Sequence, residues 1–231
     1  KKHELEFYET NYIKFLDKVD AVYIASPHHT HYEYIKIALE KGKHVLCEKP
    51  MVLSAVEAQE LYELANIKKC ILLEAIKTAF APGFIRLISI AKSGLIGKIK
   101  NVDATFTKLV SGNIRELDIN QAGGSITELG TYPLLAIIKL LGNNIEDVNY
   151  YSYFDNERKV DLFTKFNIIY KDAIGTGKVG LGVKSEGDLI ISGTKGYIYV
   201  PSPWWKTEYF EIRFEDFNDN RKYYYKFDGD G

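Results

Sequence analysis

The sequence predicts an α/β fold in which a doubly wound parallel sheet is followed by an α+β part with a mainly antiparallel sheet. Two observations predict it. Between residues 20 and 76, strand-like apolar runs alternate with helical patterns at the spacing of a βαβαβ unit, whose crossovers are right-handed. After Gly142, nearly every segment instead has the pattern of a strand. A parallel half followed by a strand-rich half indicates two domains, over residues 1–77 and 78–231.

In the first part, local signals mark the elements. The run "DAVYIAS" (20–26) is continuously apolar, as expected for a parallel strand buried on both faces. One helix ends at Gly42, and the next opens with a capping box from Ser54 to Glu57. The expected order is strand 20–26, helix 31–43, strand 43–48, helix 54–69 and strand 70–76.

In the second part, a helix is predicted to begin near Pro82 and to end at Gly94. A second helix is expected over residues 123–142, with Pro133 as an internal kink. A hairpin turn is expected at residues 193–196. The remaining segments predict strands at 101–110, 146–154, 161–170, 178–183, 187–192, 197–200, 208–215 and 221–227.

The composition narrows the class of protein. The chain has 231 residues, of which 46% are hydrophobic and 26% charged, which is typical of a globular protein. The net charge is −1 without a basic tract, which argues against a nucleic-acid partner. No run approaches the ~18 apolar residues of a membrane helix. Cys47 and Cys70 lie inside apolar runs, which favours a reduced, cytoplasmic protein over a disulfide scaffold.

Charged residues stand directly at the end of a predicted buried strand. In "HVLCEKPM" (44–51), Glu48 and Lys49 follow the apolar run without a spacer, and Pro50 comes next. "SPHH" (26–29) ends the preceding strand in the same way. Doubly wound folds bind ligands outside the carboxyl ends of their strands. We therefore expect both segments to face a ligand crevice.

The chain resembles the Gfo/Idh/MocA family of NAD(P)-dependent oxidoreductases in an ordered series of motifs. These motifs are "VDAVYIASPHHTHYEYIKIALEKGKHVLCEKPM", "EAIKTAFAPGFIRLISIAKSGLIGKI", "GGSITELGTYPL" and "GTKG". The resemblance implies a Rossmann-like dinucleotide-binding domain over 1–77. It implies a domain for substrate binding and oligomerisation over 78–231. It also implies that the chain is a fragment without the N-terminal phosphate-binding βα unit and the C-terminal tail.

One segment imitates a phosphate-binding loop. "GTGKVG" (175–180) satisfies G-x-G-x-x-G, but that motif acts only between a strand and a helix whose first turn meets the pyrophosphate. A strand-like stretch follows it here. We interpret its glycines as part of a strand and turn.

The resemblance implies that Lys49, Tyr132 and Glu128 are catalytic. Lys49 matches the lysine of the family's "EKP" motif, which lies beside the nicotinamide and the reacting oxygen. Tyr132 matches the proton donor or acceptor, four residues after the acidic position, where Glu128 replaces the more usual aspartate. A tyrosine of pKa ~10 needs a nearby cation to act near neutral pH. Lys49 is expected to supply that charge, whereas the alternative for Tyr132 is a place in a core.

The resemblance also implies cofactor contacts near the same crevice. The residues expected to bind NAD or NADP are Ser26, Pro27, His28, His31, Glu48 and Lys49, with His28 in place of the family's usual asparagine. A metal site is the alternative for the three histidines of "HHTH", but without a carboxylate or cysteine partner they form a weak ligand set. No metal is therefore expected.

Two further features bear on the substrate. Lys77 stands at a position that is usually apolar or aromatic in the family. It could bind an anionic substrate such as a phosphorylated or nucleotide-linked sugar, or it could be an exposed lysine. Tyr132 is expected to contact the substrate as well. Trp204 and Trp205 could stack on a sugar, although an interface or core role is favoured.

The leading interpretation is a cytoplasmic NAD(P)-dependent oxidoreductase that moves a hydride between nicotinamide and a sugar-like alcohol or ketone. Its expected partners are a small carbohydrate-like substrate and further copies of itself, a dimer or tetramer formed through the sheet, with neither nucleic acid nor membrane. The alternatives are a non-catalytic ligand-binding or assembly relative, or an inactive fragment of such an enzyme. Retention of both Lys49 and Tyr132 favours the enzyme.

Overall fold

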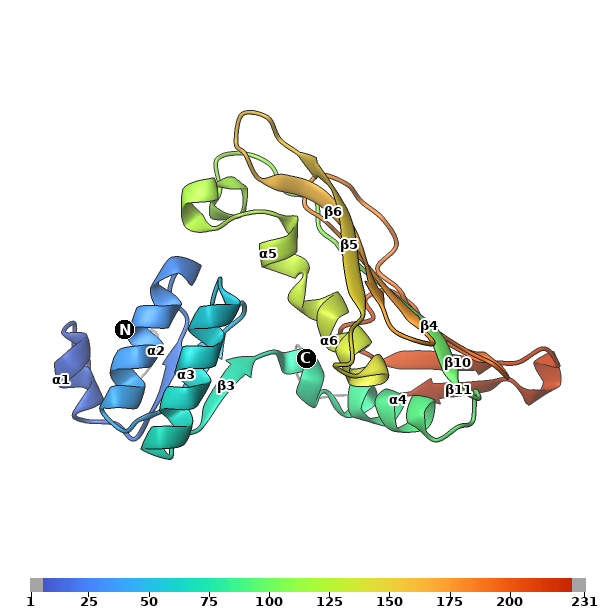
Figure 1. Cartoon of the computed structure of the whole chain (residues 1–231), viewed down its shortest axis with the longest axis horizontal. Helices are drawn as coiled ribbons and strands as arrows, with labels where there is room; N and C mark the ends of the chain where they lie inside the picture. Colours follow the sequence, from blue (N-terminus) through green and yellow to red (C-terminus); the bar gives the residue numbers. More distant parts are fainter. Residues whose placement is uncertain (1–5, 226–231) are drawn as a thin grey trace. The chain divides into compact units, whose positions relative to one another are not determined.

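The computed structural model describes residues 6–225, which fold into two compact units (Figure 1). The boundary between the units falls between Ala75 and Ile76, two residues before the predicted domain boundary. Each unit has its own hydrophobic core.

The first unit is a three-stranded parallel sheet in the order β1-β2-β3, as the βαβαβ pattern predicted. The loops that join the strands contain helices α2 and α3. Ser54 caps α3, because its hydroxyl accepts a hydrogen bond from the Val56 amide. The elements are α1 (Tyr12–Leu16), β1 (Ala21–Ile24), η1 (His28–Thr30), α2 (His31–Glu40), β2 (His44–Glu48), α3 (Ala55–Lys68) and β3 (Leu72–Ala75).

The prediction that the first strand is buried on both faces is wrong for the described residues. Burial alternates along β1, and the residues Tyr23, Leu46 and Leu73, which share one face, are 58%, 39% and 47% exposed. Both α2 and α3 share a core with the opposite face. The reason is topological: successive right-handed crossovers in the same direction place their helices on the same side of a sheet.

The second unit is built on an eight-stranded sheet in the order β11-β10-β9-β8-β4-β7-β6-β5. All neighbouring pairs are antiparallel except β4 and β7, which confirms the predicted mainly antiparallel sheet. The expected hairpin turn joins β8 and β9, where the Gly193 amide donates to the Gly196 carbonyl. The strands are β4 (Ile99–Thr107), β5 (Asp147–Phe154), β6 (Asp161–Ile169), β7 (Ile174–Gly180), β8 (Leu189–Gly193), β9 (Tyr197–Val200), β10 (Tyr209–Arg213) and β11 (Arg221–Tyr224).

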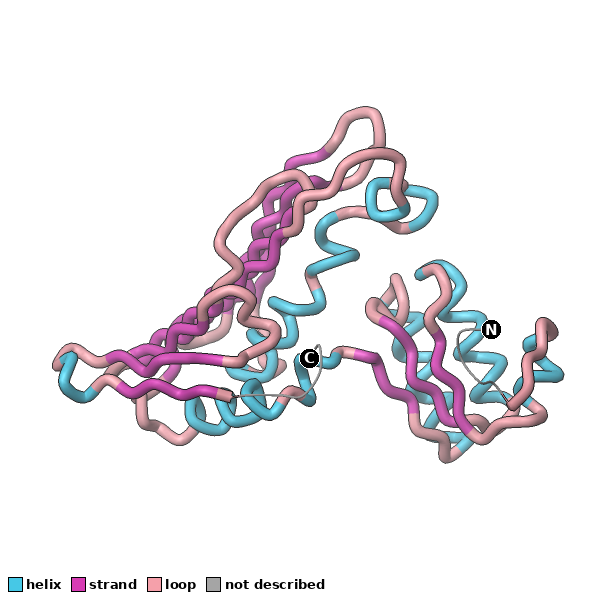
Figure 2. Tube along the Cα trace, turned by 180° about the vertical axis from the view of Figure 1, so that it is seen from behind, coloured by secondary structure: helices cyan, strands magenta, loops and turns pink. Residues whose placement is uncertain are grey.

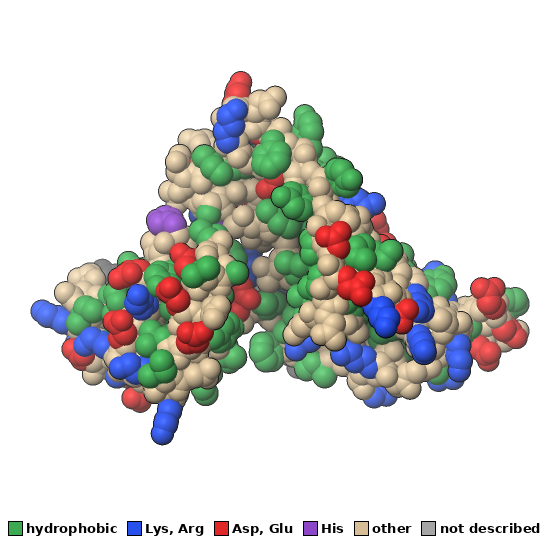
Figure 3. Space-filling model, in the orientation of Figure 1, with side chains coloured by type: hydrophobic (Ala, Val, Ile, Leu, Met, Phe, Trp, Pro, Cys, Tyr) green, Lys and Arg blue, Asp and Glu red, His purple; other side chains and the backbone are tan. Residues whose placement is uncertain are grey.

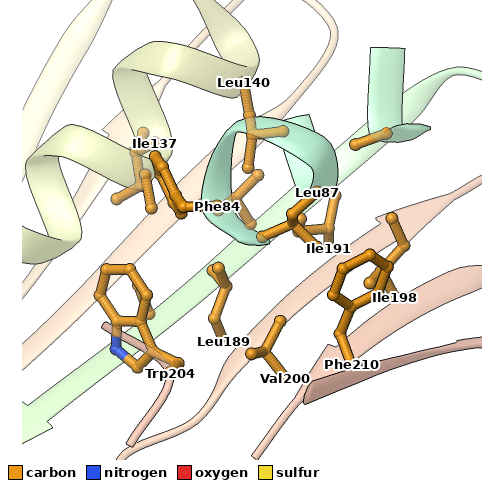
Figure 4. Packing of buried hydrophobic residues seen from close by; sticks show 14 of the residues in the cluster. Phe84, Leu87, Ile137, Leu140, Leu189, Ile191, Ile198, Val200, Trp204 and Phe210 are labelled. Atoms are coloured by element: carbon orange, nitrogen blue, oxygen red, sulfur yellow. The ribbon is translucent and has the colours of Figure 1, made fainter. Parts of the chain in front are cut away.

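Helices α4 (Pro82–Lys92) and α6 (Thr131–Leu141) pack on one face of this sheet, and Figure 2 shows the strands from the other side. The core between them contains Phe84 and Leu87 from α4 and Ile137 and Leu140 from α6, above Leu189, Ile191, Ile198, Val200 and Phe210 of the sheet (Figure 4). Trp204 is fully buried in this core, and its indole donates a hydrogen bond to the Thr105 carbonyl. The remaining short elements are η2 (Lys77–Phe80), η3 (Arg115–Leu117), η4 (Ile119–Gln121), α5 (Ser125–Leu129) and η5 (Phe217–Asp219).

The predicted single helix over 123–142 is instead two helices, α5 and α6, that meet at Gly130. Pro133 lies in the first turn of α6, where its missing amide hydrogen costs no intrahelical bond, so it causes no internal kink. The strand predicted at 178–183 begins earlier, at Ile174. It contains the glycines of "GTGKVG", paired with β4 on one side and β6 on the other, so that motif lies within a strand.

Candidate functional site

The loop after β2 is held by carboxylates of the strands themselves. The Tyr23 hydroxyl of β1 donates to Glu48, whose other oxygen accepts a 3.3 Å bond from the Lys49 amide. The bond to Glu48 raises the pKa of Tyr23 to about 12. The Met51 amide donates to Glu74 of β3 at 2.9 Å. The backbone on both sides of Lys49 and Pro50 is therefore fixed from two neighbouring strands.

His31 joins the loops that follow β1 and β2. It is fully buried at the start of α2, and its Nδ1 lies 2.9 Å from the Pro50 carbonyl. Its Nε2 lies 2.8 Å from the Ser26 carbonyl. The two loops follow strands that are neighbours in the parallel sheet, because Ile24 of β1 pairs with Cys47 of β2. This arrangement gives His31 a role in holding the loops together, and its predicted cofactor contact stays a prediction.

The other predicted cofactor residues surround the same histidine. Ser26 and Thr30 exchange a 2.6 Å hydrogen bond between their hydroxyls. His28 is the first residue of η1, directly after Pro27, and it is buried. Its ring lies edge-on to the ring of His31, with 5.7 Å between the centroids. Ser26, Pro27, His28, His31, Glu48 and Lys49 thus lie at the carboxyl ends of two neighbouring strands, and their cofactor contacts stay predictions.

In the second unit, Glu128 of α5 forms an ion pair that the sequence did not indicate. Its side chain is buried, with only 5% of the residue exposed. The Arg115 guanidinium donates to both carboxylate oxygens, from Nη1 to Oε1 at 2.6 Å and from Nη2 to Oε2 at 3.1 Å. Glu128 raises the pKa of Arg115 further above its ordinary value. Two parallel charge-assisted bonds of this kind fix orientation as well as charge.

Two glycines allow the loop carrying Arg115 to pack against the start of α5. A Cβ at Gly123 would lie 2.8 Å from the Arg115 carbonyl oxygen, which is too close for any other residue. Gly124 has φ +123°, and its amide donates to the Glu116 carbonyl at 2.9 Å. Asp161 of β6 then caps α5, accepting a 3.0 Å bond from the Ile126 amide. The "GGSITELG" motif is therefore explained by local geometry.

The substitution Gly124→Ala is expected to destabilise the second unit by about 2–4 kcal/mol, because it combines backbone strain with a clash. The added Cβ would lie 2.4 Å from Asp161 Oδ1, so the cap of α5 would have to move. Urea unfolding of the chain measures the change. Gly112→Ala is the matched control, since Gly112 also has positive φ but no atom within 4 Å of the added Cβ. Equal losses in the two variants would contradict the importance of the Asp161 contact.

Tyr132 of α6 packs in an aromatic cluster. Its ring lies 4.8 Å from that of Phe106, which stacks on Trp205 at 3.7 Å with the planes 4° apart. Phe106 and Trp205 line a pocket of about 690 Å³, together with Thr107, Lys108, Leu109, Lys184, Ser202 and Pro203. Of the tryptophan pair, Trp204 is thus a core residue and Trp205 contributes to a pocket.

Lys77 lies in η2, near the same segment. It is exposed, and the next residue, Thr78, donates its hydroxyl to the Trp205 carbonyl at 2.9 Å. That bond ties η2 to the wall of the pocket. Lys49 belongs to the first unit and Tyr132 to the second, so their predicted approach to one substrate oxygen stays a prediction.

Two other classes of feature are absent from the described part of the chain. Within residues 6–225, no three His, Cys, Asp or Glu side chains gather closely enough to hold a metal ion. No helix among these residues is both long and apolar enough to cross a membrane.

Comparison with known protein families decides the classification. Residues 2–75 match the model described as "Oxidoreductase family, NAD-binding Rossmann fold", and residues 84–199 match that of the GFO/IDH/MocA C-terminal domain. The chain belongs to the Gfo/Idh/MocA family. The resemblance drawn from "GKHVLCEKP" and the later motifs is therefore confirmed.

Individual members of this family resemble the chain over most of its length. It is 31% identical over 188 residues to trans-1,2-dihydrobenzene-1,2-diol dehydrogenase from Sus scrofa. The matched region covers 81% of the chain and 56% of that enzyme. It is 33% identical over 147 residues to dTDP-3,4-didehydro-2,6-dideoxy-alpha-D-glucose 3-reductase from Actinomadura kijaniata. This matched region covers 62% of the chain and 44% of that enzyme.

A solved structure shows the same fold. A 3-ketoreductase from Actinomadura kijaniata, in complex with NADP and TDP-benzene, superposes with a TM-score of 0.83 at 24% identity. The match covers 93% of the chain and 68% of that enzyme. The chain thus spans little more than half the length of the dehydrogenase and two thirds of the ketoreductase.

Proposed function

We propose that the intact protein is an NAD(P)-dependent dehydrogenase or reductase that acts on a sugar-like alcohol or ketone. The observation that carries the proposal is the position of Lys49 directly after β2, at the carboxyl edge of a parallel sheet, in a chain of this family. Dinucleotides bind at that edge in doubly wound folds.

The residues at this edge fit the nicotinamide end of such a cofactor. The loops after β1 and β2 lie side by side because their strands are paired, and His31 joins them through the carbonyls of Ser26 and Pro50. Ser26, His28 and Lys49 offer hydroxyl, imidazole and ammonium groups there. When bound, nicotinamide supplies or accepts the hydride.

The roles of the chain's own residues follow from their chemistry. The Lys49 ammonium stabilises the negative charge that develops on the substrate oxygen. Tyr132 gives the proton to that oxygen in reduction and takes it in oxidation. In the ketoreductase from Actinomadura kijaniata, structures exist with one lysine and with one tyrosine substituted. In that enzyme the substituted lysine and the substituted tyrosine are separated along the chain by almost the same number of residues as Lys49 and Tyr132 are here. This agreement supports the catalytic roles proposed for Lys49 and Tyr132.

We propose that the pocket beside Phe106 and Trp205 receives the sugar-like part of the substrate. An apolar ring face can stack on an aromatic side chain, and Phe106 connects this pocket with Tyr132. Lys77, near the same wall, is proposed to contact the substrate. The test is a turnover assay of the intact protein with NAD⁺ and NADP⁺ against D-xylose and trans-1,2-dihydrobenzene-1,2-diol. Failure to oxidise either sugar-like alcohol, together with no binding of either dinucleotide, would contradict the proposal.

Self-association through the sheet is a further part of the proposal. The outer face of the eight-stranded sheet, opposite α4 and α6, carries Tyr151, Tyr153, Tyr197, Tyr199 and Arg213. Arg213 lies 4.9 Å from the Tyr199 ring centroid, and tyrosine and arginine are enriched in protein interfaces. Figure 3 shows hydrophobic side chains exposed around β5 and β6. Tyr151 and Tyr153 are 77% and 66% exposed. A cytoplasmic location is proposed with it, from the two unpaired cysteines.

Sedimentation velocity of the intact protein at micromolar concentration is expected to show a dimer or tetramer. Substituting both Tyr151 and Tyr153 by lysine should convert it to monomer, because charge placed within an apolar interface must be desolvated. Tyr8→Lys is the matched control, since Tyr8 is exposed in the first unit. A monomer in the unaltered protein would contradict self-association.

A further inference from the structure

Glu128 stands at the acidic position of the motif "GGSITELGTYPL", and its carboxylate already binds Arg115. Both oxygens of Glu128 accept hydrogen bonds from Arg115, at 2.6 and 3.1 Å, and the residue is buried. A carboxylate that gives or takes a proton needs an oxygen able to reach the reacting atom. The geometry of this pair instead favours a carboxylate that is held in place by the arginine.

The backbone segment that carries the arginine is also fixed. It is tied to the start of α5 by two backbone bonds of 2.9 Å, from the Gly124 amide to the Glu116 carbonyl and from the Gly123 amide to the Asp118 carbonyl. Both terminal nitrogens of the guanidinium point to Glu128. The bidentate geometry also explains why glutamate suits this position, since an aspartate arm is one methylene shorter.

The pair lies one helical turn before the residue proposed to move the proton. Gly130 between α5 and α6 has helical dihedral angles, and its carbonyl accepts a 3.1 Å bond from the Leu134 amide. The helical path therefore continues from Glu128 to Tyr132, four residues later. Residues four apart share a helix face, so the position of one constrains the other.

We propose that Arg115 and Glu128 are positioning residues, which lock the α5–α6 junction through a bidentate ion pair and leave Tyr132 to carry the proton alone. The proposal rests on the proposed function. In reduction, the Tyr132 O–H bond breaks and the substrate O–H bond forms while the hydride adds to carbon. The resulting phenolate recovers its proton from solvent. Glu128 neither gives nor takes a proton in this step.

The stability arm of the test compares four forms of the 231-residue chain by thermal unfolding at pH 7: unaltered, Arg115→Met, Glu128→Gln and the double variant. Arg115→Met should lower Tm by roughly 6–15 °C, since a buried carboxylate loses both hydrogen bonds from the guanidinium. The double variant should recover much of that loss. Glu157→Gln, at an exposed site in the β5–β6 hairpin, should leave Tm unchanged. An unchanged Tm in Arg115→Met, or no recovery in the double variant, would overturn the proposed pair.

The activity arm uses the intact protein with NADP⁺ and either D-xylose or trans-1,2-dihydrobenzene-1,2-diol. Glu128→Gln, whose amide oxygen still accepts from Arg115, should keep kcat within about fivefold, whereas Tyr132→Phe should lose about 10²-fold or more. Arg115→Met should lower kcat more than it changes KM, and Arg115→Lys should recover part of kcat. If Glu128→Gln loses as much kcat as Tyr132→Phe at unchanged Tm, Glu128 carries the proton and the inference is wrong. Full activity in Tyr132→Phe would instead contradict the proposed function.

Discussion

Lys49→Ala in the intact protein is expected to lower kcat by about 10²–10³ while the dissociation constant for dinucleotide changes little. The expectation follows from the proposed role of the ammonium, which is to stabilise charge that develops on the substrate oxygen only as the reaction proceeds. Lys49 stands on a loop fixed by Glu48 and Glu74, so shortening its side chain should not displace the neighbouring backbone.

Steady-state kinetics and fluorescence titration with NADPH measure the two quantities separately. Lys68→Ala is the matched control, because Lys68 is exposed at the end of α3 in the same unit. It should leave both quantities unchanged. A kcat of Lys49→Ala equal to that of the unaltered protein would remove Lys49 from the mechanism. A parallel loss of dinucleotide binding would show that Lys49 mainly holds the cofactor.

The elements of the first unit could be predicted because their signals are local. Ser54 and Gly42 mark helix ends through hydrogen bonds and dihedral angles within a few residues, and both lie where the structure needs them. Which face of a strand is covered depends on where helices far along the chain pack. The alternation in β1 could therefore not be read from "DAVYIAS", in which nearly every residue is apolar.

Similar reasons separate the predicted and unpredicted parts of the site. Lys49 and Tyr132 were predicted from motifs with fixed spacing, and their roles stay predictions. Arg115 was missed because it lies in a short 3₁₀ segment without periodicity, thirteen residues before its partner. One signal could have found it. Glu128 directly precedes Leu129 and the mostly apolar α6, and a buried carboxylate needs a cation. Arg115 is the one arginine between Arg86 and Arg158.

Tyr132→Phe is expected to lower kcat of the intact protein by about 10²–10⁴, the usual contribution of a positioned acid or base. The substitution removes one hydroxyl and keeps the ring. The contact with Phe106, 4.8 Å between centroids, should therefore persist, and with it the stack on Trp205. Binding of dinucleotide and the thermal midpoint are expected to stay close to those of the unaltered protein.

The measurement is kcat and KM for a single alcohol substrate, together with Tm for each variant. Tyr150→Phe serves as the control, since Tyr150 is 69% exposed on β5 and should tolerate loss of its hydroxyl without effect on kcat. A fall in kcat that accompanies a large fall in Tm would assign Tyr132 to packing instead of proton transfer. Tyr132 contacts an aromatic cluster and is also proposed to transfer the proton, so measuring turnover and stability separately distinguishes the two roles.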